Sequence, residues 1–266
     1  MKRLFSAMGF PLLAILIYFF FQIICSIPLA FMLKDPVNPN MTPVALSLFA
    51  ANLLTMLAII PFKVFGQRKS LLSTGTTSSS LFVISIVGML CGIFSINFIC
   101  EFFNLNDIAI DMLMGMSENI LGILAICIIG PICEELLFRG AIMYPMLRKG
   151  INPAVCIFVS ALIFGIIHFN PAQIPVAMLV GILFGIIYYY TKSLVATSIC
   201  HIINNSTSVL LMSIYGENIK EMTMSNIFGS TTHVIIMAII FAALSAVLLR
   251  YFCKNQGKPN WKEGDF

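Results

Sequence analysis

Two adjacent glutamates and an arginine interrupt a long apolar segment of the chain, at Glu134, Glu135 and Arg139. If this segment crosses a membrane, each charge costs about 2.5–3.5 kcal/mol on insertion scales, or roughly 8–10 kcal/mol for all three if summed. Glu135 and Arg139 stand four positions apart, so they share one helix face and can form an ion pair. Glu134 is rotated from Glu135 by about 100°. The spacing predicts that Glu134 is the carboxylate available for chemistry, with a structural ion pair between helices as the alternative.

Two further apolar segments each carry a histidine. His168 stands near the end of one, and His201 in the other is followed four positions later by Asn205, on the same helix face. A carboxylate and an imidazole can activate water, and a second imidazole with an amide can stabilise a developing oxyanion. These groups together predict hydrolysis inside a membrane, with proton-coupled transport as the competing use. Taken singly, His168 could be a packing residue, and His201 and Asn205 could join helices by hydrogen bonds.

The composition indicates that these residues lie in a membrane protein. The 266 residues are 59% hydrophobic and 10% charged, with a mean hydropathy of +1.00, whereas soluble domains have about 45–50% apolar and about 25% charged residues. The net charge of +4 comes from scattered basic residues, which predicts no nucleic-acid partner. The eight cysteines include no CxxC pair and are interpreted as small hydrophobic residues.

Apolar runs long enough to span a bilayer predict the fold class. We expect an all-α, polytopic membrane protein, a single membrane domain over 1–266, with about eight transmembrane helices and a polar active-site cavity within the membrane. The runs lie at about 10–33, 44–65, 81–103, 120–147, 153–170, 174–190, 194–215 and 232–253.

The distribution of lysine and arginine predicts the orientation. Twelve of the fifteen basic residues fall in one set of loops and in the C-terminal tail, while the opposite loops carry most of the acids. Cytoplasmic loops are enriched in lysine and arginine. We therefore expect a multi-pass cell-membrane protein with both termini and the 63–80 loop in the cytoplasm. The twelve residues are Lys2, Arg3, Lys63, Arg68, Lys69, Arg148, Lys149, Lys192, Arg250, Lys254, Lys258 and Lys262.

Three motifs in order make the sequence similar to a known family. Glu-Glu-x-x-x-Arg at 134–139, Phe-x-x-x-His at 164–168 and His-x-x-x-Asn at 201–205 resemble the pattern of the CPBP intramembrane proteases, also called the Abi or CAAX protease family. That family includes type II CAAX prenyl endopeptidases and bacterial proteins linked to bacteriocin processing and self-immunity. The resemblance covers about 120–210, the expected catalytic core, whereas the first three spans match only in being hydrophobic.

The resemblance implies an eight-helix fold, endopeptidase activity and a role for each motif residue. Glu134 looks like the general base that activates water together with His168. His201 and Asn205 look like the oxyanion stabilisers, with the adjacent amide of Asn204 able to substitute for Asn205. The remaining two motif residues, Glu135 and Arg139, look like supporting residues that hold the site.

The sequence leaves the cofactor and the substrate open. Glu134, His168 and His201 could supply three zinc ligands with one open position, but the HExxH signature of many zinc proteases is absent. A metal-free mechanism is therefore favoured, with zinc as the alternative. The expected partners are the lipid bilayer and a membrane-associated or lipidated peptide or protein substrate. Two other functions remain: a non-catalytic immunity protein that acts by binding, and a proton-coupled transporter.

Overall fold

The computed structural model describes residues 8–29, 41–62 and 77–261, and within these ranges every regular element is a helix. The all-α fold expected from the sequence is therefore confirmed. The long helices are α2 (Gly9–Ser26), α4 (Thr42–Ile59), α5 (Ser79–Glu101), α10 (Pro153–Ile166), α11 (Gln173–Thr191), α12 (Leu194–Tyr215) and α14 (Thr231–Gln256). Short helices α6 (Ile110–Ser117) and α13 (Met224–Ile227) and two 3-10 turns, η1 (Ile60–Phe62) and η5 (Gly216–Lys220), complete the connections.

The fourth predicted span is one continuous helical rod with two π-helical stretches. It runs through α7 (Ile120–Leu124), η3 (Ala125–Ile129), α8 (Gly130–Glu135), η4 (Leu136–Met143) and α9 (Tyr144–Arg148), and η3 and η4 are the π-helical parts. In the apolar 18-residue stretch of this rod half of the residues are buried, compared with 11% in that of α2. This rod is the centre of the molecule, and it carries Glu134, Glu135 and Arg139.

Each of the eight apolar segments contains a helix, and in the described part of the chain seven helices are long and apolar enough to cross a membrane. The exception is α10, which has 14 residues and ends at Ile166 rather than at 170. Pro171 limits how far the helix can continue, because the residue before it, Asn170, disfavours the α conformation, but α10 ends four residues before that limit. In addition, Phe169 has a φ of 50°, outside the range of a right-handed helix. His168 therefore lies in a turn just after α10.

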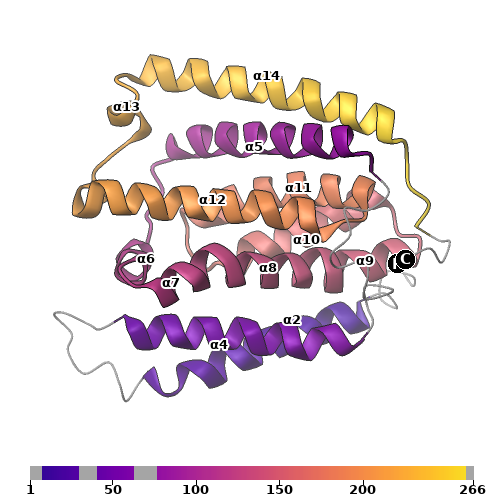
Figure 1. Cartoon of the computed structure of the whole chain (residues 1–266), viewed down its shortest axis with the longest axis horizontal. Helices are drawn as coiled ribbons and strands as arrows, with labels where there is room; N and C mark the ends of the chain where they lie inside the picture. The colour runs from indigo at the N-terminus through magenta and orange to yellow at the C-terminus, as the bar shows by residue number, and fades with distance from the viewer. Residues whose placement is uncertain (1–7, 30–40, 63–76, 262–266) are drawn as a thin grey trace.

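The helices are arranged in layers around the central rod (Figure 1). Helices α14 and α5 pack together on one side, and α2 and α4 pack together on the opposite side. The rod and helices α10, α11 and α12 lie between these two outer pairs. Polar side chains begin several of these helices by accepting backbone N–H groups of the first turn. These N-terminal caps are Ser78 for α5, Asn152 for α10, Ser193 for α12 and Ser230 for α14.

The basic loops within the described ranges gather at one end of the bundle. Arg148, at the end of α9, donates to the carbonyl oxygen of Trp261 at 3.2 Å, and Lys192, between α11 and α12, donates to that of Asn260 at 2.8 Å. The opposite end is acidic, and there Lys220 forms ion pairs with acids such as Asp111, at 2.6 Å. The fold thus separates the two kinds of loop that the orientation prediction depends on.

We expect the basic end to face the cytoplasm, because positive residues are retained on that side. The clearest test uses Lys69, which lies outside the described residues, in a background that lacks the native cysteines. A cysteine at Lys69 should resist a membrane-impermeant thiol reagent added outside intact cells, whereas a cysteine at Glu217, at the acidic end, should react. Strong labelling at Lys69 with none at Glu217 would reverse the orientation.

Candidate active site

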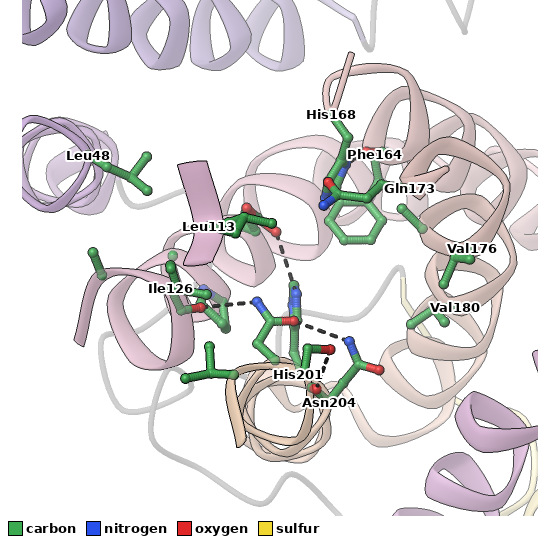
Figure 2. A pocket seen from close by; sticks show the side chains of 18 of the residues that line it. Leu48, Leu113, Ile126, Phe164, His168, Gln173, Val176, Val180, His201 and Asn204 are labelled. Atoms are coloured by element: carbon green, nitrogen blue, oxygen red, sulfur yellow. Dashed lines mark hydrogen bonds and ion pairs between the residues drawn. The ribbon is translucent and has the colours of Figure 1, made fainter. Parts of the chain in front are cut away.

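A cavity of about 390 Å³ lies between the central rod, α10, α11 and α12 (Figure 2). Four residues predicted to be catalytic line it, namely Glu134, His168, His201 and Asn205. They come from α8, from the turn after α10 and from α12, so the fold brings together side chains from three segments. The shared polar cavity expected from the sequence is present.

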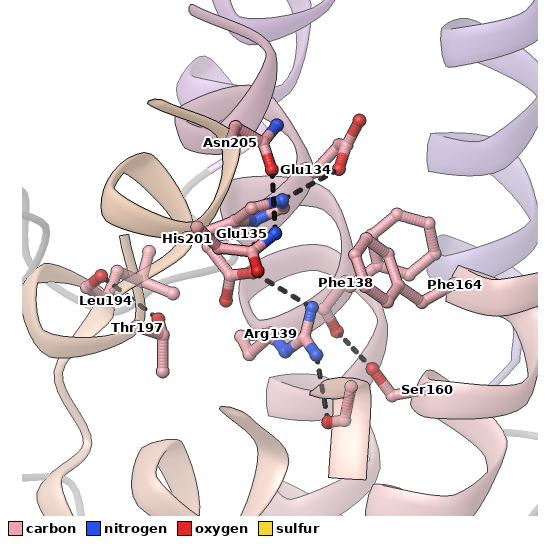
Figure 3. Close-up of polar contacts among 12 residues, drawn as sticks. Glu134, Glu135, Phe138, Arg139, Ser160, Phe164, Leu194, Thr197, His201 and Asn205 are labelled. Atoms are coloured by element: carbon pink, nitrogen blue, oxygen red, sulfur yellow. Dashed lines mark hydrogen bonds and ion pairs between the residues drawn. The ribbon is translucent and has the colours of Figure 1, made fainter. Parts of the chain in front are cut away.

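Glu135 and Arg139 form the ion pair that their spacing predicts. Arg139 Nη1 lies 3.1 Å from Glu135 Oε1, and both side chains are completely buried (Figure 3). Arg139 Nη2 also donates to the carbonyl oxygen of Gly181 in α11 at 2.9 Å. The guanidinium group lies over the rings of Phe164 and Phe184, 4.9 and 5.2 Å from their centroids. The pair therefore joins the rod to α10 and α11.

His201 stands between the two glutamates. Its Nδ1 lies 3.2 Å from Glu135 Oε1 and its Nε2 lies 3.6 Å from Glu134 Oε2 (Figure 3). Because a carboxylate accepts hydrogen bonds, Nδ1 donates to Glu135, and Nε2 is the nitrogen directed towards Glu134 and the cavity. Buried Glu135 thus orients an imidazole, while Glu134, with 20% of its side chain exposed, is open to the cavity.

His168 presents one defined nitrogen to the cavity. Its Nδ1 lies 2.7 Å from the carbonyl oxygen of Phe164, and because a carbonyl only accepts, Nδ1 carries the proton. A neutral imidazole then has an unprotonated Nε2 that can accept a proton from water. The Phe164 ring packs edge-on against both imidazoles, with centroids 5.1 Å from His168 and 5.7 Å from His201. Phe164 separates the two histidines and fixes their planes.

Asn205 donates a hydrogen bond to the rod at a backbone oxygen that the π-helical turn η3 leaves free. In the π-helical turn the N–H of Gly130 bonds to the oxygen of Ala125, five residues earlier. The next N–H in this register would bond to Ile126, but it belongs to Pro131, which has none. The Ile126 oxygen is therefore free to accept from Asn205 Nδ2 at 3.0 Å. Asn205 thereby joins α12 to the rod, and the second hydrogen of its amide remains available to the cavity.

A row of amides extends from Asn205 across the cavity wall. Asn204 Nδ2 donates to Asn205 Oδ1 at 3.2 Å, and Asn97 Nδ2 in α5 lies 3.4 Å from Asn204 Oδ1. Both residues line the cavity. The hydrogen bond from Asn204 orients the amide of Asn205, and the substitution of Asn204 for Asn205 stays a prediction.

The first three predicted spans contribute cavity residues that the sequence analysis did not identify. Tyr18 of α2, Asn52 of α4 and Asn97 of α5 all line it. Asn52 is 2% exposed and accepts a hydrogen bond from Gln22 Nε2 at 3.0 Å. The signal was present in the sequence, because amides within apolar spans usually face a polar interior.

The three zinc ligands considered from the sequence, Glu134, His168 and His201, are not grouped around one point in the described structure. Within the described ranges, no three histidine, cysteine, aspartate or glutamate side chains are grouped as metal ligands. Glu134 and His201 face each other, but His168 does not join them as a third ligand. Both imidazoles do donate Nδ1 to an acceptor, which also orients histidines that bind metals.

The part of the chain that carries most of this cavity is similar to known proteins. Residues 116–207 match the family model of the Rce1-like type II CAAX prenyl endopeptidases. The chain is also 33% identical, over 103 residues, to the membrane-embedded CAAX protease MroQ of Staphylococcus aureus strain USA300. This alignment covers 37% of the chain and 42% of MroQ, so the chain spans less than half the length of that relative. No solved structure matches the chain significantly.

Proposed function

We propose that this chain is an endopeptidase of the CPBP intramembrane protease family that cleaves membrane-associated or lipidated peptides, a proposal supported by the family match over residues 116–207 and by the likeness to a membrane-embedded CAAX protease. The observation that carries the proposal is the cavity itself. Glu134, His168 and His201 all line this one cavity, and the Nδ1 of each histidine is held by an acceptor, which leaves the Nε2 of both imidazoles available for chemistry. A carboxylate and two oriented imidazoles can supply the general base and the oxyanion donor with which a peptide bond is hydrolysed.

In the proposed mechanism, Glu134 and His168 hold a water molecule between them. One of them removes a proton as the water oxygen attacks the carbonyl carbon of the scissile peptide bond. The negative charge that develops on the carbonyl oxygen is stabilised by hydrogen bonds from His201 Nε2, when it carries a proton, and from the second N–H of Asn205. The proton then moves to the peptide nitrogen, the C–N bond breaks, and an acid and an amine are released.

Glu135 and Arg139 act behind this site. Glu135 accepts from His201 Nδ1 and so turns Nε2 towards the cavity, and Arg139 neutralises the buried Glu135 charge. The proposed reaction therefore uses two carboxylates in different environments. Glu134, which is partly exposed to the cavity, acts on the water, and Glu135, which is buried, orients His201.

A cleavage assay separates this proposal from transport and from binding. The purified protein, reconstituted in lipid vesicles, should cleave peptides anchored in the same bilayer, and in water labelled with heavy oxygen one label should enter each new carboxylate. Cleavage without the label would exclude hydrolysis. Proton-coupled solute uptake without cleavage would favour a transporter, and tight peptide binding without cleavage would favour an immunity protein. Processing of a bacteriocin leader would use the same site and can be tested by offering such a leader as the peptide.

We further propose that hydrolysis requires no metal, because the favoured mechanism assigns every step to side chains that line the cavity. Active protein should then contain far less than one equivalent of metal, and chelation should leave turnover unchanged. Elemental analysis of the active fraction, followed by chelation and metal add-back, is the measurement. A stoichiometric metal whose removal and return track activity would establish zinc or another ion held by Glu134, His168 and His201.

A further inference from the structure

The turn that carries His168 has an unusual backbone. Phe169, directly after His168, has a φ of 50°, a left-handed conformation that bulky residues rarely adopt. Its side chain is 65% exposed and so is not held by burial. Such a conformation persists only where surrounding contacts impose it, which raises the question of what holds this turn.

Asn170, the next residue, supplies those contacts. It is 1% exposed, and its Nδ2 donates to Asp107 Oδ1 at 2.7 Å. Its Oδ1 accepts from the backbone N–H of Ile108 at 3.3 Å and of Ala172 at 3.4 Å. Asp107 Oδ1 in turn accepts from the N–H of Ala109 at 3.0 Å. We call this connection the Asp107–Asn170 bridge, and it ties the loop after α5 to the turn after α10.

The bridge lies beside the site. Asp107 lines the same cavity as His168, and Asn170 is two positions along the chain from that histidine. The Asn170 carbonyl oxygen also accepts from the N–H groups of Gln173 and Ile174, each at 3.0 Å, where α11 begins. Asn170 therefore fixes the turn on both sides, and the direction of the His168 ring depends on that turn.

We propose that Asp107 and Asn170 are positioning residues for His168: by holding Phe169 in its left-handed conformation, the bridge keeps His168 Nδ1 on the Phe164 carbonyl and Nε2 towards the cavity. This inference rests on the proposed function for its catalytic consequence, but the ring orientation can be measured without activity. Asp107 lies outside the matched residues 116–207, so the bridge links the family core to a loop that precedes it.

The pattern of donors and acceptors allows a test by exchange. Asn170→Asp alone places two carboxylates where a hydrogen bond stood, which is repulsive. Asp107→Asn alone is mild, because Asn170 Nδ2 can still donate to an amide oxygen. In the double variant, the carboxylate at position 170 accepts from Ile108, Ala172 and the new amide at position 107, so the hydrogen bond between the two side chains is restored with donor and acceptor exchanged. The bond from Ala109 is not restored, because Asp107 Oδ1 accepts both from Asn170 and from Ala109; the rescue is therefore expected to be large but incomplete.

The expected result is a specific order of activities on a bilayer-anchored peptide. Asn170→Asp should lower kcat about 10²-fold with KM changed less than about threefold, since misplacing a catalytic group mainly affects the chemical step. Asp107→Asn should stay within about threefold of wild type, and the double variant should recover to within about tenfold. Asp111→Asn is the matched control, because Asp111 is an exposed acid at the same end and should leave kcat unchanged.

The second readout is the tautomer of His168, observed by NMR on protein with isotope-labelled histidine and assigned with His168→Ala. Wild type and the double variant should show a proton on Nδ1, and Asn170→Asp a mixture of tautomers. An unchanged tautomer and kcat in a folded Asn170→Asp variant would overturn the inference, as would a double variant no better than Asn170→Asp. An inactive wild type in which the tautomer still responds would instead count against the proposed function alone.

Discussion

Replacing Glu134 with glutamine should abolish peptide cleavage while leaving the fold intact. Glutamine keeps the shape of the side chain but cannot accept a proton from water, and losing a general base costs about 10²–10⁴ in rate. The fold should tolerate the change, because Glu134 is partly exposed to the cavity and Arg139 is paired with Glu135 instead. The measurement is turnover of a bilayer-anchored peptide, with thermal unfolding of the same preparation as the control for folding.

His168→Ala should have a similar effect, and the double variant should be little worse than either single variant, because residues that act as one unit are not additive. If the folded Glu134→Gln variant keeps most of its activity, Glu134 has no part in water activation. Glu135 would then be the next candidate, although its complete burial and its bond to Arg139 argue against that role.

The oxyanion residues provide a graded comparison. His201→Ala and Asn205→Ala should each cost roughly 10²–10³ in rate, the scale for losing one oxyanion donor. Both side chains also have structural partners, since His201 bonds to Glu135 and Asn205 to the Ile126 oxygen. Rates must therefore be normalised to the folded fraction, because an unpaired buried group costs about 1–3 kcal/mol of stability.

Removing Arg139 should have the largest effect on stability. Arg139→Ala leaves the Glu135 charge buried without its guanidinium partner, which typically costs about 3–5 kcal/mol, and it also breaks the bond to the Gly181 oxygen. We expect a low yield in detergent and a large fall in Tm, together with loss of activity. Arg250→Ala is the matched control, because this arginine lies exposed on α14 and should change Tm little.

A second variant separates the structural role of the ion pair from its role in the site. Replacing Glu135 and Arg139 together with leucine removes both buried charges, and such exchanges are often neutral for stability. Tm should recover relative to Arg139→Ala, whereas activity should stay low because His201 Nδ1 has lost its acceptor. An Arg139→Ala protein that melts like wild type but is inactive would show that Arg139 takes part in the chemistry.

Local rules were sufficient for the membrane class and for the geometry within the central rod. A helix places residues four apart on one face whatever surrounds it, so the spacing alone paired Glu135 with Arg139 and turned Glu134 away. The length of α10 was overestimated, because the Asn170-Pro171 step limits the helix only near residue 170, whereas the helix ends at Ile166 and the chain turns before Phe169.

Contacts between elements depended on the tertiary structure. The rise of a helix gives the depth of a residue but neither the tilt of the helix nor its neighbours, so the convergence of Glu134, His168 and His201 could not be derived from spacing. Pro131 lacks an N–H group, so the sequence predicts that one backbone carbonyl of the rod has no helical partner. Only the π-helical register shows that this carbonyl belongs to Ile126, and only the packing of α12 shows that Asn205 donates to it. The Asp107–Asn170 bridge joins loops 63 positions apart, and a hydrogen bond at that separation leaves no periodic trace in the sequence, because it depends on how the intervening helices pack.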